Sequence, residues 1–260
     1  AAALAKAAEW SALSVLKIGD NSIGAPGAAS LAMLLASSEL LTCLNIRGNS
    51  IGDSGASALA TAMQTSCGLL ELDVADNHIT FKGARDLGSA VGKGVIRTFV
   101  LGGNPLGVRG VRAVATAMAR CGSVTALDVG STNCGPIGVA DVVEALEHCP
   151  SVQHLNLEHN ALGCKGAQHL ADAMRSTTTR ALKTLVLHGN DLGDEGAICI
   201  VEALGRPSAE PMAGGSVRPS RAGITSLDLG NNGLSAAGAE ACAEAIGRCT
   251  TLASLALQLN

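Results

Sequence analysis

The sequence predicts an α/β solenoid in which about nine repeats each supply one short parallel strand and one helix. An asparagine recurs along the whole chain, and a single position breaks its row: Asn21, Asn49, Asn77, Asn104, Thr132, Asn160, Asn190, Asn232 and Asn260. The steps between these anchor positions are 28, 28, 27, 28, 28, 30, 42 and 28 residues. A constant period of about 20–50 residues is typical of repeat architectures, in which each unit buries its apolar face against the next.

Residues 41–63 show the strand and the helix of one unit. Leu44 and Ile46 alternate with polar residues, which predicts a short strand. Leu59, Ala60 and Met63 share one face at helical spacing, which predicts a helix packed against that strand. Strands pair at about 4.8 Å, whereas packed helices need about 8–10 Å. A stack of such units therefore curves, with its strands on the inner arc.

Two further positions in each repeat have a predicted structural role. Five residues before the anchor, the chain places a residue that we expect in the core: Leu16, Leu44, Leu72, Phe99, Leu127, Leu155, Leu185, Leu227 and Leu255. Six residues after the anchor, it places a glycine: Gly27, Gly55, Gly83, Gly110, Gly138, Gly166, Gly196 and Gly238. A glycine there permits either a turn that a Cβ would strain or a close approach of two chain segments.

The anchor asparagine follows the strand, where backbone groups turn inward without a partner in the sheet. Its side-chain amide both donates and accepts, so we expect it to satisfy buried backbone groups. Thr132, which breaks the row, has about half that capacity.

The repeated pattern Asn-x-Leu/Ile-Gly-x-x-Gly-Ala, followed by Leu-Ala-x-Ala-Leu, resembles the long-repeat, ribonuclease-inhibitor-like subfamily of leucine-rich repeats. That resemblance implies a right-handed horseshoe with parallel strands on the concave face and helices on the convex face. It covers the whole chain, so we predict a single solenoid over residues 1–260. Neither end shows a polar capping repeat, which suggests a section of a longer chain.

Composition excludes several classes of function. The formal net charge of −4 argues against a nucleic-acid partner, which would favour a basic protein. No apolar run reaches the roughly 18 residues of a membrane span, which argues against a membrane partner. The nine cysteines form no C-x-x-C pair, and most occupy core positions, as Cys134 does in place of Ile51. We therefore expect reduced thiols and an intracellular, cytoplasmic protein, with a cilium or the cytoskeleton as further locations.

One connection is much longer than the others. Residues 205–223 are rich in Pro, Gly and Ser and form an inserted loop between a predicted helix and the next strand. Insertions of this kind often lie on a binding face, although length alone costs little entropy and a tolerated insertion is the simpler interpretation. The loop supplies three candidate partner-binding cations: Arg206, Arg218 and Arg221.

The repeat register also places side chains on the concave face. These candidate partner-binding residues are Lys17, Arg47, Glu71, Asp73, Asp76, Asp128, His154, Glu158, His159, His188 and Asp228. Glu158 and His188 take the same position in adjacent repeats, so they could touch. A metal site or acid–base pair there is the alternative to a solvated polar face. The middle of the face, with Gly102, Gly103 and Gly130, is predicted to be almost bare.

No catalytic motif survives inspection, so we expect neither an enzyme nor a cofactor, a bound metal or a small-molecule substrate. The stretch 88–94 lacks the spacing and the Ser/Thr of a phosphate-binding loop. The sequence is best interpreted as a non-catalytic scaffold for other proteins, a structural subunit of a larger assembly, with ciliary and cytoskeletal assemblies as the examples that the resemblance implies. The resemblance implies two alternatives: a small-GTPase regulator similar to the Ran GTPase-activating proteins, and a sensor segment of a Nod-like receptor.

Overall fold

The computed structural model describes residues 12–65, 68–176, 179–205 and 223–260. Within these ranges nine strands alternate with eight helices. The strands are β1 (Val15–Lys17), β2 (Cys43–Asn45), β3 (Glu71–Asp73), β4 (Thr98–Val100), β5 (Ala126–Asp128), β6 (His154–Asn156), β7 (Thr184–Val186), β8 (Ser226–Asp228) and β9 (Ser254–Ala256). The helices are α2 (Gly24–Ser37), α3 (Gly52–Met63), α4 (Phe81–Val91), α5 (Gly107–Cys121), α6 (Gly135–His148), α7 (Gly163–Arg175), α8 (Gly193–Gly205) and α9 (Ala236–Ile246).

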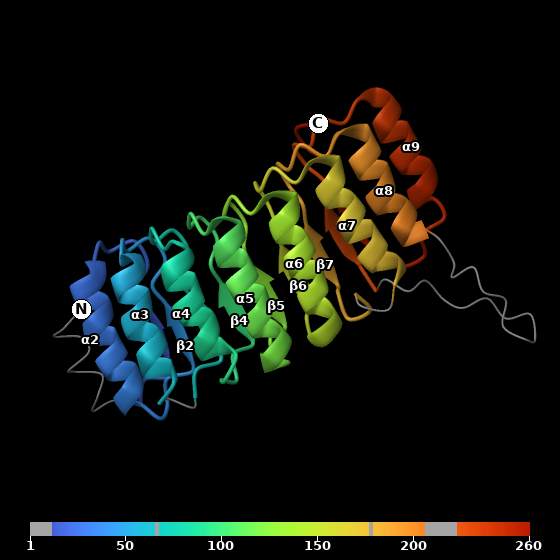
Figure 1. The fold of residues 1–260 in the computed structure, drawn as a ribbon. Coiled ribbons are helices and arrows are strands. Elements are labelled where there is room, and N and C mark those ends of the chain that lie inside the picture. The colour runs from blue at the N-terminus through green and yellow to red at the C-terminus, as the bar shows by residue number, and fades with distance from the viewer. Residues whose placement is uncertain (1–11, 66–67, 177–178, 206–222) are drawn as a thin grey trace, which may run out of the picture.

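All nine described strands form one parallel sheet in chain order, from β1 to β9. The register matches the repeat: Leu16 lies beside Leu44, Leu44 beside Leu72, and Leu72 beside Phe99. The helices stand in a row on one side of the sheet, each packed against the next along the chain (Figure 1). The predicted strand–helix solenoid is therefore confirmed. We call the sheet face opposite the helices the concave face and the outer side of the helix row the convex face.

A continuous hydrophobic core lies between the sheet and the helices. The central strand residues predicted to be buried are buried in the first eight strands, and Phe99 is the largest of them. In β9 the equivalent residue, Leu255, is half-buried. Burying one such leucine stabilises the fold by roughly 1.5–3 kcal/mol, so the row contributes a large share of the driving force.

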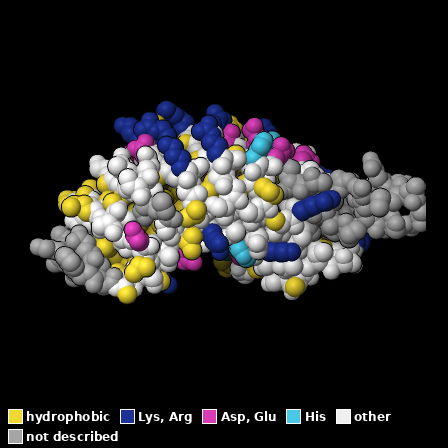
Figure 2. All heavy atoms as spheres, turned by 90° about the horizontal axis from the view of Figure 1, so that it is seen from below, with side chains coloured by type: hydrophobic (Ala, Val, Ile, Leu, Met, Phe, Trp, Pro, Cys, Tyr) yellow, Lys and Arg dark blue, Asp and Glu magenta, His cyan; other side chains and the backbone are white. Residues whose placement is uncertain are grey.

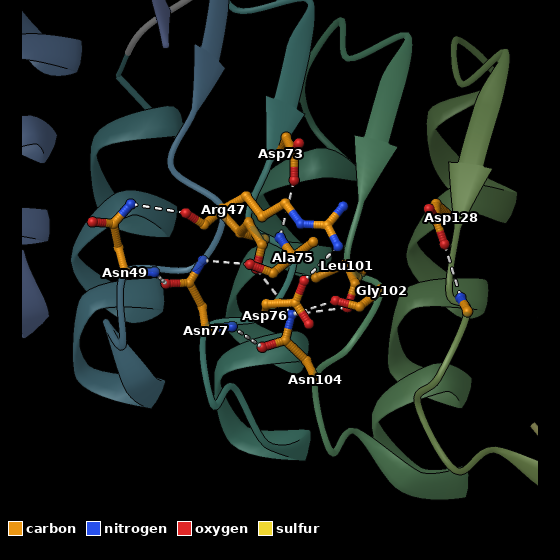
Figure 3. Close-up of polar contacts among 12 residues, drawn as sticks. Arg47, Asn49, Asp73, Ala75, Asp76, Asn77, Leu101, Gly102, Asn104 and Asp128 are labelled. Carbon is orange, nitrogen blue, oxygen red and sulfur yellow. Dashed lines mark hydrogen bonds and ion pairs between the residues drawn. The ribbon is translucent and has the colours of Figure 1, made fainter. Parts of the chain in front are cut away.

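The anchor asparagines form a hydrogen-bonded ladder that joins neighbouring repeats (Figure 3). The Asn77 amide donates to the carbonyl of Ala75 in its own repeat (2.8 Å) and to that of Ile46 in the preceding one (2.9 Å). Its Oδ1 accepts from the backbone N–H of Asn49 (3.0 Å). The predicted role is confirmed, and the side chain also fastens one repeat to the next. Thr132 makes part of this set, because its hydroxyl donates to the carbonyl of Val129 (2.7 Å).

The glycine six residues after each anchor serves close helix packing. At Gly55, a Cβ would lie 2.7 Å from the Cβ of Ile51 and 2.8 Å from that of Ala28 in the preceding helix. At Gly83, it would lie 2.9 Å from the Cβ of Ala56. Both glycines lie inside helices. Close approach is thus the correct one of the two expected roles.

The cysteines behave as small packing residues. Eight described cysteines carry free thiols, and three of them are buried: Cys134, Cys149 and Cys242. Burial raises the pKa of the Cys134 thiol to about 11, which keeps it protonated and unreactive at neutral pH. Among the described residues, no helix is long and apolar enough to cross a bilayer.

Candidate functional site

The concave face is the candidate site because the helices leave it open. Figure 1 shows the helices on the other side of the sheet. Strand side chains that point away from the core, such as Lys17 and Glu71, are therefore exposed. The charged residues that the register placed here divide into a cluster on β2 to β5 and a histidine group on β6 to β8. Lys17 lies exposed at the start of the face, on β1.

An ion pair links two repeats at the centre of the first cluster. The Arg47 guanidinium lies 2.7 Å from Oδ2 of Asp76, and both side chains are partly exposed, at 57% and 43%. The Asn45 amide donates to Oδ2 of Asp73 at 2.7 Å. Figure 3 shows Arg47 reaching across the surface between Asp73 and Asp76. An exposed pair of this kind contributes only about 0.2–1 kcal/mol to stability. It orients the side chains more than it stabilises the fold.

A row of Asp and Asn side chains accepts backbone hydrogen bonds just after the strands end. In each case Oδ1 accepts the backbone N–H two residues further on, at 2.8–3.1 Å: Asn45, Asp73, Asp128, Asn156 and Asp228. Such Asx turns satisfy a donor that the sheet ladder leaves free. From the sequence, the acidic members are expected on the concave face as candidate partner-binding residues, and these turns are not predicted. The recurrence of Asp or Asn four residues before five of the anchors is the signal in the sequence that points to these turns.

Two carboxylates of this row are less acidic than usual. Burial raises the pKa of Asp73, although its backbone hydrogen bond and Arg47 act in the opposite direction. Burial likewise raises the pKa of Asp128 against the hydrogen bonds from Gly130 and Asn156. Both carboxylates are half-buried, so an incoming cation would meet groups that are already partly removed from water.

The middle of the face is covered rather than bare, which corrects the sequence interpretation. A Cβ on Gly130 would lie 2.7 Å from Cγ of Glu158, and one on Gly102 would lie 3.1 Å from Oδ1 of Asp128. A Cβ on Gly103 would overlap the carboxylate of Asp76. The glycines therefore form a floor over which longer side chains of neighbouring repeats lie.

The residue before each anchor is left-handed in every repeat. Its φ lies between 51° and 69° at Asp20, Gly48, Asp76, Gly103, Ser131, His159, Gly189, Asn231 and Leu259. Asp, Asn and Gly tolerate this conformation best. This backbone bend carries Asp76 and His159 to the rim of the concave face, and nothing in the periodicity revealed it.

The histidine group forms contacts other than the predicted pairing. His188 packs against His159, with ring centroids 5.2 Å apart, and its Nδ1 lies 3.8 Å from Oδ1 of Asp228. His154 lies elsewhere on the face and approaches the hydroxyl of Thr184 at 3.1 Å. Among the residues that the structure describes, no group of three or more His, Cys, Asp or Glu side chains is arranged to hold a metal ion. Arg206, Arg218 and Arg221 lie outside the described residues.

The fold and this open face define a class of repeat protein that presents a surface rather than a pocket. A sequence model described as Leucine Rich repeat matches residues 37–60, 65–88, 148–171, 180–201 and 224–241. The chain is a leucine-rich repeat protein, with repeats typical of the ribonuclease-inhibitor-like subfamily. Such domains generally bind other proteins and are usually non-catalytic.

No curated protein sequence matches the chain. A solved structure with a similar course of the chain is leiomodin-1 actin-binding site 2, at 12% sequence identity and a TM-score of 0.43. The match covers 66% of this chain and 84% of the leiomodin chain. At that identity, nothing that leiomodin binds carries over to this protein.

Proposed function

We propose that this protein is a non-catalytic scaffold that binds another protein along its concave face, as a structural subunit of an intracellular, ciliary or cytoskeletal assembly. The observation that carries the proposal is the fixed row of polar side chains on an otherwise open sheet. Asp73 and Asp128 are held by backbone hydrogen bonds, and Arg47 and Asp76 by their ion pair. Side chains held before binding lose less entropy when a partner arrives.

The charge of this face indicates the kind of partner. Glu71, Asp73, Asp76 and Asp128 outnumber the single cation, Arg47, on β2 to β5 and the loops that follow. Both oxygens of Asp73 accept hydrogen bonds within the protein, Oδ1 of Asp128 accepts a backbone N–H, and Oδ2 of Asp76 contacts Arg47. Glu71 is exposed. A basic segment of a partner protein would find a complementary surface here.

The composition of the surface favours a permanent assembly over tight capture of a single ligand. Binding hot spots are enriched in Trp, Tyr and Arg, yet the chain has no Tyr and one Trp. Arg47 is the concave-face member of that set among the described residues. Many weak contacts from several subunits suit such a surface better than one strong interface.

Cross-linking mass spectrometry on the native extract tests this function. Amine-reactive cross-links from Lys17, which is exposed at the start of the concave face, to a fixed set of proteins at near-equal stoichiometry are expected. They should be lost in the variant Glu71→Lys/Asp76→Asn, in which Asn keeps the left-handed backbone acceptable. The variant Glu240→Lys/Glu244→Gln changes the net charge equally on α9 and should keep them. Cross-links that depend on the nucleotide state of a small GTPase would instead favour the regulator and overturn the scaffold.

A further inference from the structure

Charge is distributed very unevenly along this acidic chain. Residues 81–121, which span α4 and α5, hold seven basic residues and one acidic residue, a formal charge of +6: Lys82, Arg85, Asp86, Lys93, Arg97, Arg109, Arg112 and Arg120. The whole chain has a formal net charge of −4, so the residues outside this segment together carry −10. Because the opposite charges cancel in the total, the net charge of −4 does not reveal this basic segment.

The cations repeat in register on the two adjacent helices. Lys82 and Arg109 lie five residues after their anchors, Arg85 and Arg112 eight, and Lys93 and Arg120 sixteen. All six side chains are exposed. We call these six residues the basic strip. In Figure 2, Lys and Arg side chains gather on the helical side of the molecule over α4 and α5.

A groove runs between the two helices under the strip. Arg85 and Lys93 of the α4 side and Arg120 of α5 line it, together with the hydroxyls of Ser89 and Thr116. Its floor is backbone and small side chains, because a Cβ on Gly92 would lie 3.2 Å from the carbonyl oxygen of Ala117. The Thr116 hydroxyl already donates to the carbonyl oxygen of Arg112 at 2.8 Å, which leaves the Ser89 hydroxyl as the donor for a ligand. A hydroxyl donor between two rows of cations suits carboxylate groups along an extended chain.

Four of the six residues of the strip have no ion-pair partner among the residues that the structure describes. Arg85 pairs with Asp86 at 2.9 Å and Arg112 with Asp141 at 3.0 Å. The Arg109 guanidinium lies 4.1 Å above the ring of Phe81. Among the described residues, Lys82, Lys93, Arg109 and Arg120 take part in no ion pair. The strip is therefore available to an outside anion.

The strip is short and ends against negative charge. Helices α4 and α5 contain 11 and 15 residues, or roughly 16–22 Å at 1.5 Å per residue. The next helix, α6, carries Asp141, Glu144 and Glu147 and no Lys or Arg, and Figure 2 shows acidic side chains beside the basic ones. A long polyanion such as duplex DNA would extend onto this acidic helix and be repelled. A flat membrane would meet the same acidic neighbour.

We infer that the basic strip is a second docking surface, which binds a short acidic segment, rich in Asp and Glu, of a partner protein. Its length, its groove with the Ser89 hydroxyl between cations, and its acidic border all favour a segment of a few turns or an extended stretch of similar length. It lies on the convex face, opposite the concave surface proposed above. The protein would then join a basic partner on one side to an acidic partner on the other.

Fluorescence anisotropy with a fluorescein-labelled peptide of alternating Glu and Gly tests the inference on the full chain. We expect saturable binding that weakens with added salt. The variant Arg85→Glu/Lys93→Glu/Arg120→Glu should lose about tenfold or more in affinity, since each exposed pair contributes about 0.2–1 kcal/mol. The matched control Lys165→Glu/Lys183→Glu/Arg248→Glu, with the same change in net charge elsewhere, should lose much less. If the first variant does not fold, the three alanine substitutions replace it.

Three results would overturn the inference. One is the absence of peptide binding to the wild-type protein, and another is equal loss in the variant and in its matched control. The third is tighter binding to a DNA duplex or to phosphatidylserine vesicles than to the peptide, with the same loss in the variant. Because Glu71 and Asp76 are unchanged throughout, failure here leaves the concave-face proposal standing, and the reverse also holds.

Discussion

The carboxylate of Asp53, in α3, caps the helix of the following repeat through Thr80. Its Oδ1 accepts the backbone N–H of Thr80 at 2.8 Å and that of Gly83 at 3.0 Å, and its Oδ2 accepts the Thr80 hydroxyl at 2.7 Å. Asp194 contacts the N–H and hydroxyl of Ser235 in the same way, at 2.8 and 2.6 Å. In the other repeats the position of Thr80 is a glycine with a left-handed φ of 56–63°. The Asp and the hydroxyl residue thus replace that glycine together.

The substitution Asp53→Ala should destabilise the fold by about 1 kcal/mol, because it leaves the start of α4 without its cap from the preceding repeat. Thermal and urea denaturation would measure the loss. The neighbouring exposed substitution Ser54→Ala should have little effect. In a Thr80→Gly background the loss from Asp53→Ala should shrink, because glycine needs no such acceptor. Equal losses in both backgrounds would contradict this coupling.

The cap should make stability depend on pH in the acid range. The pKa of Asp53 is lowered, because hydrogen bonds from Thr80 and Gly83 outweigh the opposing effect of burial, and hydrogen bonds from Ser235 lower that of Asp194. A lowered folded-state pKa gives stability that is present above the unfolded value, about 3.9, and is lost as pH falls through the folded value. The stability difference between wild type and Asp53→Ala should therefore be constant from pH 5 to 7 and shrink below about pH 4. A difference that grows on acidification would refute it.

Replacing a buried anchor should be costly. Asn77 is fully buried, and Asn77→Ala leaves several backbone groups without hydrogen-bond partners. Each such group costs about 1–3 kcal/mol, so we expect the free energy of unfolding to fall by about 3–5 kcal/mol. Asn77→Thr should cost less, because Thr132 shows that a hydroxyl makes part of the set at this position. Urea denaturation of the three proteins gives the order, and an alanine variant as stable as the threonine variant would show that the ladder contributes little.

A methyl group at the glycine of the helix–helix contact should be unfavourable. Gly55→Ala places a Cβ within 2.7–2.8 Å of Ile51 and Ala28, which should cost about 1–3 kcal/mol despite the better helix propensity of alanine. Ser57→Ala, in the same helix, brings no such contact and should be neutral or slightly stabilising. Calorimetry would measure the stability of the two variants and so distinguish the effect of packing from that of helix propensity. A Gly55→Ala variant more stable than the wild type would contradict the prediction, because it would show that the two helices move apart at no cost.

Much of the fold could be predicted because the same residue type recurs at equivalent positions of the repeats. Spacing alone predicted a buried anchor at Asn77, a core residue at Leu72 and a turn or close approach at Gly83. The structure confirms the burial of the first two and the close approach at the third. The surface was harder, because its side chains are fixed by backbone conformation. The left-handed bend at Asp76 and the Asx turn of Asp73 decide which oxygen faces solvent, and neither leaves a periodic trace in hydropathy. The basic strip was missed because total charge averages over opposite faces.

Because of the asparagine ladder, the spacing between neighbouring repeats does not depend on how many residues connect them. Asn160 donates its N–H to Asn190 at 2.8 Å across a 30-residue step, and Asn190 donates to Asn232 at 2.9 Å across a 42-residue step. The same bond spans the ordinary 28-residue step from Asn49 to Asn77 at 3.0 Å. Neighbouring repeats whose anchors are bonded in this way are therefore held at the same distance, however much chain intervenes. Thr132, which has no amide oxygen, interrupts the row of bonds. Evolution, or a protein engineer, can lengthen a rim connection to acquire a new contact without altering the spacing of any surface along the arc.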